Sequence, residues 1–283
     1  MTGDTKAASD MERFFISGCQ RSGTTMLRLI LESHPSIQCF DEIVGNDILI
    51  RETKGENNKF FVKDGATLLG FKIPRFAEQM TLAEFSDPEY GVFPSFYKGQ
   101  KIIHVVRDAL DVIGSMMRLK EHGRALWIDQ YGRGILQAMA KSPNTRPFYK
   151  QKYEDLERRN LPIHLVGALY WEIKNQGFFD LLEHNKPVYA VRYESLVGSP
   201  KGELLKLMRF LGLSWSDSLL NHPEHPHSEL YDKGLTIGET DPHRPIDMQS
   251  VGSYRNFMTE QQIQDVIHYV EDFTNKIINA LTP

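Results

Sequence analysis

The stretch FFISGCQRSGTTMLRLIL, residues Phe14–Leu31, decides the fold that the rest of the chain is predicted to build around it. The apolar run FFI is too short for a helix and is followed at once by serine and glycine, so it predicts a buried strand. After the second glycine, apolar residues recur at helical spacing. A strand, a glycine loop and a helix in this order point backbone N–H groups and a helix N-terminus at an anion. The stretch therefore predicts a phosphate-binding loop.

The loop carries the residues that a phosphate site needs. Gly18 and Gly23 bracket it, Arg21 adds a permanent cation, and Thr24 and Thr25 place hydroxyl groups where the helix begins. The spacing nearly matches the nucleoside-triphosphate motif G-x-x-x-x-G-K-[ST], but Thr24 stands where that motif has its lysine. Because triphosphate enzymes use the lysine on the β- and γ-phosphates, its absence favours a smaller phosphate group. The alternative is an ordinary strand-to-helix turn whose glycines occur by chance.

The bulk properties of the chain narrow its class. Its 283 residues are enough for one large α/β domain, and its net charge of −4 gives no electrostatic reason to expect a nucleic-acid partner. With only Cys19 and Cys39, no disulfide framework is expected. The sequence shows neither a signal peptide nor an apolar run of membrane-spanning length, so we expect a cytoplasmic protein without a membrane partner. The polar residues 1–12 are predicted to be a disordered leader, followed by a single domain over residues 13–283.

Three further apolar segments predict strands of the same sheet, at residues 68–73, 102–106 and 187–191. Continuous apolar runs of this kind are typical of buried parallel sheets, so the predicted fold is α/β, with a P-loop-like central parallel sheet flanked by helices. Arg107 follows the strand at 102–106, and Ser115 lies two turns into the next helix. Both can reach the carboxyl edge of the sheet, where ligands of open α/β sheets bind, and together they can hold a second phosphate. His104, alone within the strand, is interpreted as a core residue.

Charged residues also stand at or after the ends of two other apolar segments. Asp41 and Glu42 follow the segment IQCF, residues 37–40. They can be a charge pair that favours the N-terminus of the next helix, or a general base beside the phosphate site. Position alone leaves both interpretations open. Lys72 stands near the end of the strand at 68–73, where it either extends its amino group to solvent or points into the site.

Two later regions depart from the pattern of strands and helices. Residues 122–160 have helix-like content broken by prolines and are predicted to be a helical insertion that lines the acceptor side. Residues 222–248 contain four prolines and four histidines and are predicted to be a flap over the site. The histidines are conceivable zinc ligands, but no cysteine accompanies them and the region is irregular, so no metal site is predicted.

Four separated segments occur in the order found in sulfotransferases that use 3′-phosphoadenosine 5′-phosphosulfate (PAPS), and the chain resembles that family over roughly residues 14–260. The segments are GCQRSGTTML, VVRDALDVIGS, RYESLVGSPKGELLKLMRFLGL and VGSYRN. The resemblance implies that Arg107 and Ser115 hold the 3′-phosphate and that Tyr193 lies near the adenine. It implies that the 5′-phosphosulfate binds the first loop, at Arg21, Ser22, Gly23, Thr24 and Thr25. It also implies that a late loop closes over the nucleotide, with Arg255 as an additional phosphate contact, through Gly252, Ser253, Tyr254, Arg255 and Asn256.

Departures from the cytosolic small-molecule sulfotransferases bear on the catalytic residues. Those enzymes have lysine where Arg21 stands, Arg-Lys-Gly where this chain has Asp-Met-Gln at 247–249, and a histidine in a Lys-Thr-His motif where this chain reads Lys-Ile-Pro at 72–74. The chain looks more like bacterial, tyrosylprotein and heparan sulfotransferases, in which a glutamate after the first helix is the base. This resemblance implies Glu42 as general base, with Arg21 and Lys72 as the catalytic cations. The flap histidines His225 and His227 are the next candidates for the base.

The resemblance implies an enzyme that moves a sulfonate group from PAPS to an acceptor hydroxyl without a metal and releases adenosine 3′,5′-bisphosphate (PAP). The chain also resembles the sulfotransferase domains of modular polyketide synthases, which implies the β-hydroxyl of an acyl chain on an acyl carrier protein as the acceptor. Two other functions compete with this one. A P-loop kinase or NTPase would use ATP and magnesium, which Thr24 disfavours. A non-catalytic nucleotide-binding interaction domain would keep the loop without transferring sulfate.

Overall fold

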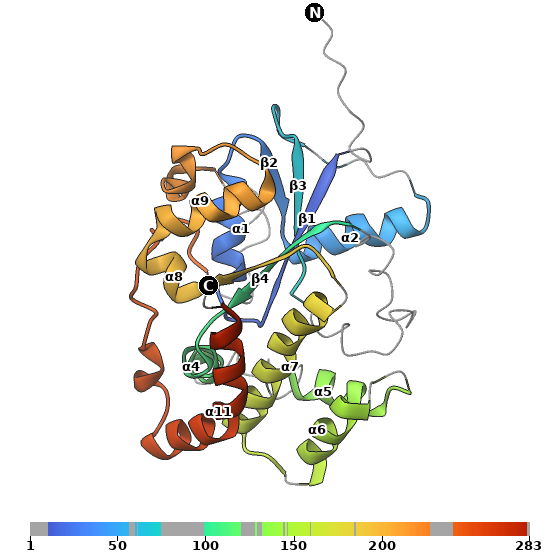
Figure 1. Ribbon diagram of the computed structural model, residues 1–283, viewed down its shortest axis with the longest axis vertical. Helices are drawn as coiled ribbons and strands as arrows, with labels where there is room; N and C mark the ends of the chain where they lie inside the picture. Colours follow the sequence, from blue (N-terminus) through green and yellow to red (C-terminus); the bar gives the residue numbers. More distant parts are fainter. Residues whose placement is uncertain are drawn as a thin grey trace, which may run out of the picture.

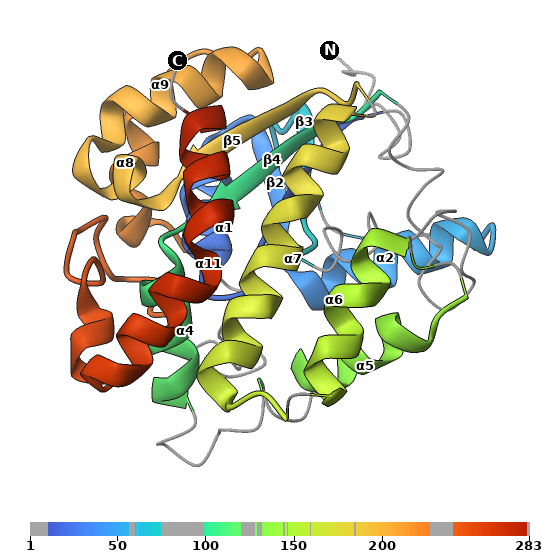
Figure 2. The same ribbon diagram turned by 60° about the horizontal axis from the view of Figure 1, so that its bottom comes forward.

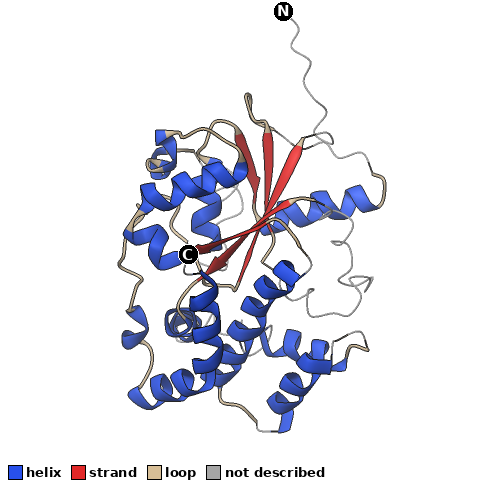
Figure 3. Ribbon diagram, viewed as in Figure 1, coloured by secondary structure: helices blue, strands red, loops and turns tan. Residues whose placement is uncertain are grey.

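Five parallel strands form one sheet at the centre of the molecule, in the order β2-β3-β1-β4-β5 (Figure 3). The computed structural model describes residues 11–56, 60, 62–74, 99–119, 128, 132–143, 145, 147–158, 160–183, 185–226 and 240–281. The strands are β1 (Glu12–Gly18), β2 (Ile37–Phe40), β3 (Leu68–Lys72), β4 (Lys101–Val106) and β5 (Val188–Arg192). The predicted α/β fold with a central parallel sheet is confirmed.

Helices flank the sheet on both sides (Figure 1). The α-helices are α1 (Thr24–Glu32), α2 (Glu42–Thr53), α4 (Ala109–Leu119), α5 (Arg133–Lys141), α6 (Pro147–Arg158), α7 (Ile163–Glu183), α8 (Tyr193–Gly198), α9 (Pro200–Leu211) and α11 (Glu260–Leu281). Three short 3-10 helices are η4 (Asp217–Leu219), η5 (His222–Glu224) and η6 (Ser253–Asn256). Within the described part of the chain, no helix is both long enough and apolar enough to cross a membrane.

Alternate side chains of β1 point to opposite faces of the sheet, and they belong to a different part of the core on each face. Phe14 and Ile16 belong to a cluster with residues of α1 and α9, whereas Phe15 packs with residues of α2 on the opposite face. A third apolar cluster joins α4, α7 and α11 to α5 and α6, which lie beside α7 (Figure 2). Because β1 is buried on both faces, its sequence is a continuous apolar run rather than an alternating one.

The structure corrects the predicted boundary of the leader. Glu12, predicted to lie in the leader, begins β1 and pairs with Leu68 of β3. The segment IQCF is the strand β2, although a run of four residues is too short to show a periodicity that separates strand from helix. The described part of residues 122–160 contains α5 and α6, which agrees with its predicted helical content.

His104 lies in the core on β4. Its side chain is inaccessible to solvent, its Nε2 atom lies 3.4 Å from Asn175 Oδ1 of α7, and its ring centroid is 5.8 Å from that of Phe178. Burial lowers the pKa of His104 to about 4, because the charged imidazolium would lose its hydration. The interpretation of His104 as a core residue is confirmed.

We expect the free energy of unfolding to fall as the pH is lowered from 6.5 towards about 4. In this window His104 takes up a proton in the unfolded chain but stays neutral in the folded protein, so acidification favours unfolding by up to about 3 kcal/mol. Denaturant titrations at several pH values measure the loss. His104→Gln cannot take up this proton and should flatten the pH dependence in the window. An unchanged slope in the variant would contradict the assignment.

Candidate functional site

The carboxyl edge of the sheet gathers side chains from five separate parts of the chain. Because the strands are parallel, the residues that end or follow them share this edge. Arg21 follows β1, Glu42 follows β2, Lys72 ends β3, Arg107 follows β4 and Tyr193 follows β5. The strand order places the β1 loop between two flanks. Lys72 and Glu42 lie on the flank of β3 and β2, and Arg107 and Tyr193 lie on the flank of β4 and β5.

The loop between β1 and α1 is shaped to receive an anion. Arg21 and Gly23 have positive φ angles of 73° and 93°, and the Ser22 N–H donates to Cys19 O at 3.1 Å, which folds the loop back on itself. No side chain of the described residues caps the N-terminus of α1, so the end of the helix dipole faces the loop uncompensated. The Ser22 hydroxyl is buried and finds no hydrogen-bond partner within the described chain.

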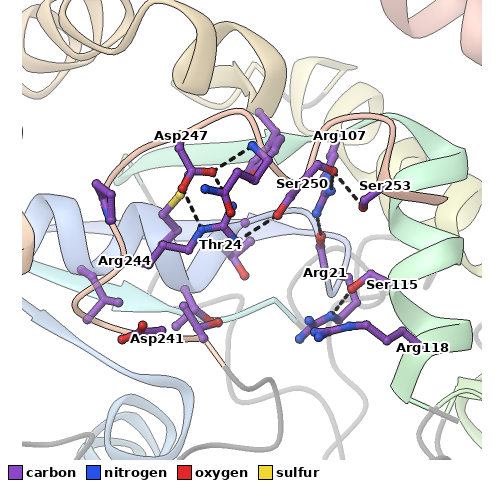
Figure 4. A pocket seen from close by; sticks show the side chains of 18 of the residues that line it. Arg21, Thr24, Arg107, Ser115, Arg118, Asp241, Arg244, Asp247, Ser250 and Ser253 are labelled. Atoms are coloured by element: carbon purple, nitrogen blue, oxygen red, sulfur yellow. Dashed lines mark hydrogen bonds and ion pairs between the residues drawn. The ribbon is translucent and has the colours of Figure 1, made fainter. Parts of the chain in front are cut away.

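A cavity of about 440 Å³ lies against this loop (Figure 4). Its walls come from the loop, α1, α4, the start of α8, η5 and the segment at 240–257. Nine of the predicted site residues line it, namely Arg21, Gly23, Thr24, Thr25, Arg107, Ser115, Tyr193, Ser253 and Asn256. The structure therefore brings together residues that the sequence analysis placed at the phosphates and at the adenine.

The guanidinium of Arg107 joins three walls of the cavity. Its Nη1 donates to Arg21 O at 3.0 Å and its Nη2 donates to Ser250 O, while its plane lies over the Tyr193 ring at 4.3 Å from the centroid. Asp111 Oδ2 lies 3.9 Å from Nη2. The Nε atom of Arg107 is buried and has no hydrogen-bond partner among the described residues. The two terminal nitrogens and the face of this guanidinium thus contact protein groups, whereas its Nε–H donor is unsatisfied within the described chain.

A second basic group lies at the α4 side of the cavity. Arg21 Nε donates to Ser115 Oγ at 2.9 Å, and Arg118, one turn further along α4, lies beside both (Figure 4). The two residues that the resemblance assigns to opposite ends of the nucleotide are thus in contact. Arg118 was missed by the sequence analysis, because an arginine near the end of a helix has an ordinary place at the helix dipole.

The late loop is attached to α4 through Asp111, which the sequence analysis also missed. Asp111 is buried; its Oδ2 accepts the Gly252 N–H at 2.9 Å and its Oδ1 accepts the Tyr254 N–H at 3.3 Å. The backbones approach closely at Gly114, where a Cβ atom would lie 2.7 Å from Tyr254 Cα. The position of the loop therefore depends on two residues of α4, the carboxylate of Asp111 and the glycine at position 114, which leaves room for the loop backbone.

The late loop faces two cavities. Ser253 and Asn256 line the main cavity, whereas Gly252, Tyr254 and Arg255 line a second one of about 290 Å³, which Arg107 also lines. The guanidinium of Arg255 lies over the ring of Tyr254, at 4.6 Å from the centroid. Successive residues of a 3-10 turn point in different directions, so contiguous residues need not share a site. Arg255 does not line the cavity of the phosphate loop but shares a cavity with Arg107, and its role as an additional phosphate contact stays a prediction.

The predicted flap supplies part of the cavity wall. Arg244 Nε donates to Asp247 Oδ2 at 3.0 Å, its Nη2 donates to Asp247 Oδ1, and its Nη1 donates to Ser250 Oγ at 3.0 Å. This pairing lowers the pKa of Asp247 and raises that of Arg244. Of the flap histidines, His222 lines the cavity and His225 does not. His227 lies outside the described residues, as do all of residues 227–239.

Glu42 and Lys72 lie close together beyond the main cavity. Glu42 Oε2 is 4.0 Å from Lys72 Nζ, and burial lowers the pKa of Lys72, which the charge of Glu42 partly offsets. Asp41 instead caps α2, since its Oδ1 accepts the N–H groups of Ile43 and Val44 at 2.8 and 2.9 Å. Asp41 thus has the helix-capping role, and Glu42 has a cationic neighbour. Within the described chain, no group of three or more His, Cys, Asp or Glu side chains could hold a metal ion.

The sequence matches the family model of the sulfotransferase domain over residues 11–277. It is similar to protein-tyrosine sulfotransferase 2 of Gallus gallus, with 24% identity over 272 residues that cover 92% of this chain and 68% of that protein. It is also similar to protein-tyrosine sulfotransferase 1 of Danio rerio, with 24% identity over 219 residues, 76% of this chain and 57% of that protein. The chain thus spans little more than half the length of the second relative.

Solved structures share the fold at low sequence identity. The sulfotransferase domain from the curacin biosynthetic pathway has a TM-score of 0.54 and 18% identity, covering 92% of this chain and 98% of that one. The sulfotransferase domain of the Synechococcus PCC 7002 olefin synthase has a TM-score of 0.53 and 20% identity, covering 93% and 95%. A mouse sulfotransferase complexed with PAP has a TM-score of 0.53 and 16% identity, covering 95% and 88%.

We expect Gly23→Ala to destabilise the protein more than Gly55→Ala. Both glycines have positive φ, at 93° and 67°, so alanine is strained at either position by about 1–2 kcal/mol. A Cβ at Gly23 would also lie 2.6 Å from the Tyr193 ring, whereas a Cβ at Gly55 would meet nothing within 4 Å. Denaturant unfolding of the two variants measures the difference. Equal losses of stability would contradict a close contact between the loop and Tyr193.

Proposed function

The chain belongs to the sulfotransferase domain family, and we propose that it moves a sulfonate group from PAPS to an acceptor hydroxyl. One observation carries the proposal. A single cavity combines a phosphate loop that has Thr24 in place of the triphosphate lysine with a second arginine, Arg107, from the end of another strand. PAPS carries phosphate groups at the 5′ and 3′ positions of its ribose, and charge-assisted bonds to two separate basic groups suit it. A kinase that binds ATP with magnesium would rely on the missing lysine.

The residues present fit the nucleotide. Arg21, the uncapped end of α1 and the hydroxyls of Thr24 and Thr25 can bind the 5′-phosphosulfate. Arg107, with its unsatisfied Nε donor, and Ser115 can bind the 3′-phosphate. The buried Ser22 hydroxyl, which has no partner within the described chain, gives the loop another polar group. Tyr193 lines the same cavity and can contact the adenine.

Catalysis requires a base and a stabiliser of negative charge. When bound, PAPS supplies the sulfonate group. Glu42 would accept the proton of the acceptor hydroxyl while the hydroxyl oxygen forms a bond to the sulfur and the bond from the sulfur to the bridging phosphate oxygen breaks, which releases PAP. Arg21 and Lys72 stabilise the negative charge that grows on the bridging oxygen and the sulfonate. The contact between Glu42 and Lys72 supports these roles, because it sets a carboxylate beside a partly buried cation on the flank next to the phosphate loop.

The proposed acceptor is the β-hydroxyl of an acyl chain on an acyl carrier protein. The similar domains of the curacin pathway and the olefin synthase support it, because each matches this chain almost from end to end. The protein-tyrosine sulfotransferases are longer than the matched segment, and their acceptor class is the main competitor. The alternative to any transferase is a nucleotide-binding domain without transferase activity.

Glu42→Gln should lower kcat by about 10²–10⁴-fold, because glutamine cannot accept the proton. The affinity for PAP should stay unchanged, since Glu42 does not line the nucleotide cavity. Sulfate transfer from PAPS measures the first quantity, and calorimetric titration with PAP measures the second.

Asp41→Asn is the matched control. Asparagine is as good an N-cap as aspartate, so the variant keeps α2 intact while removing the neighbouring carboxylate, and its turnover should be close to normal. If Asp41→Asn lost activity and Glu42→Gln did not, Asp41 would be the base. Normal turnover in both variants would leave His225 and His227 as the next candidates.

An acceptor panel tests the substrate class. With PAPS as donor, we expect sulfate transfer to carrier-bound β-hydroxyacyl chains and little transfer to tyrosine peptides, phenols, sugars or small alcohols. Transfer to tyrosine peptides or phenols alone would overturn the acyl-carrier proposal and keep the sulfotransferase. PAP binding without transfer to any acceptor would favour a non-catalytic domain.

A further inference from the structure

One charged pair in the cavity wall has no part in the roles assigned so far. Arg244 and Asp247 come from the segment after residue 239, and both line the cavity. Figure 4 shows them on one side of the cavity with Asp241, whereas Arg21, Ser115 and Arg118 lie on the other side. The two sides therefore differ in charge.

The Arg244 guanidinium is held rigidly in its plane. Two of its nitrogens donate to the two oxygens of Asp247, and the third donates to Ser250 Oγ. Asp247 is itself fixed by the Gln249 N–H, which donates to its Oδ1 at 2.9 Å. A guanidinium has five N–H groups, and these bonds use three. The described residues give no hydrogen-bond partner to the other two N–H groups, and the Arg244 side chain is 39% exposed and lines the cavity.

Arg244 is also joined to Arg107 through one residue. Ser250 accepts from Arg244 through its hydroxyl and from Arg107 through its carbonyl oxygen. Arg107 already stacks on the ring of Tyr193, and Tyr193 and Arg244 line the same cavity. The planar groups of Arg107, Tyr193 and Arg244 therefore lie in one part of the cavity.

The charges at this side are poorly suited to a phosphate. Asp247 neutralises Arg244, and Asp241 adds a second carboxylate that repels an anion. A neutral heterocycle suffers no such repulsion. Arginine planes stack on aromatic rings and on nucleic-acid bases, and a guanidinium fixed in advance loses little conformational entropy when it does so.

We propose that Arg244, oriented by Asp247, contacts the purine base of the nucleotide and contributes to base recognition. The proposal rests on the proposed function, since it assumes that the cavity takes an adenosine nucleotide. Arg244 binds the base through its guanidinium, and Asp247 positions Arg244. The phosphates are left to the arginines and hydroxyls on the opposite side and to Arg107.

Two ligands separate a base contact from a phosphate contact. PAP carries the adenine and both phosphates, and the abasic analogue 1-deoxyribose 3,5-bisphosphate carries only the phosphates. Arg244→Ala should weaken PAP binding by about 10-fold, within the range of arginine–ring contacts, and should leave binding of the abasic analogue unchanged. Calorimetric titration of the full chain with each ligand measures both affinities. Equal weakening of both ligands, or of neither, would overturn the proposal.

Two further variants sharpen the test. Arg244→Lys keeps the charge but loses the plane, so it should not restore PAP affinity; full restoration would indicate a phosphate contact instead. Arg51→Ala is the matched control, because Arg51 also pairs with an aspartate, Asp47, at 2.9 Å, but on the exposed surface of α2. It should change neither affinity. If the unmodified protein bound neither ligand, the proposed function itself would fall, whereas intact PAP binding with an unaffected Arg244→Ala variant would remove this inference alone.

Discussion

The buried guanidinium of Arg107 is the contact on which the cavity depends. It bonds to the backbone of the phosphate loop, to the backbone of the segment at 240–250 and to the face of the Tyr193 ring. These partners come from three distant parts of the chain, and the residue that joins them stands at the end of β4, next to the central strand. A planar group with five donors can satisfy several acceptors at once, which a lysine at this position could not do with the same geometry. The same guanidinium therefore holds the walls of the cavity together and gives the cavity a positive charge.

Features with a local cause could be predicted from the sequence. The phosphate loop needs positive φ at Gly23, hydroxyls at the start of a helix and a short apolar strand, and all of these lie within eighteen consecutive residues. The parallel sheet follows from apolar runs without alternation, because both of its faces are covered. Once the strands are parallel, their carboxyl ends must meet, so Arg21 and Arg107 could be placed in one site from the sequence, whereas Tyr193 was placed there by the resemblance.

Features that depend on distant contacts could not be predicted in this way. Asp111 has an ordinary position in the first turn of α4, and only the arrival of the late loop gives its oxygens their partners. Arg244 stands in an irregular, proline-containing segment, where no period reveals which side chains face inward. Arg255 belongs to a short motif that resembles a nucleotide-binding loop, and its place in a 3-10 turn directs it to a second cavity that Arg107 also lines, which the sequence did not indicate. The catalytic assignment of Glu42 still depends on resemblance and on its contact with Lys72.

The attachment of the late loop to Asp111 also bears on how the molecule assembles. The two groups that meet there, Asp111 and the Gly252 N–H, are 141 residues apart in the chain. Contacts of such high sequence separation carry a large loop-closure entropy and tend to form slowly during folding. A nascent chain that has completed its sheet would still lack one side of the main cavity. Under the proposed function, nucleotide affinity arises only in the last stage of folding, and a bound nucleotide preferentially protects fully synthesised molecules from proteolysis.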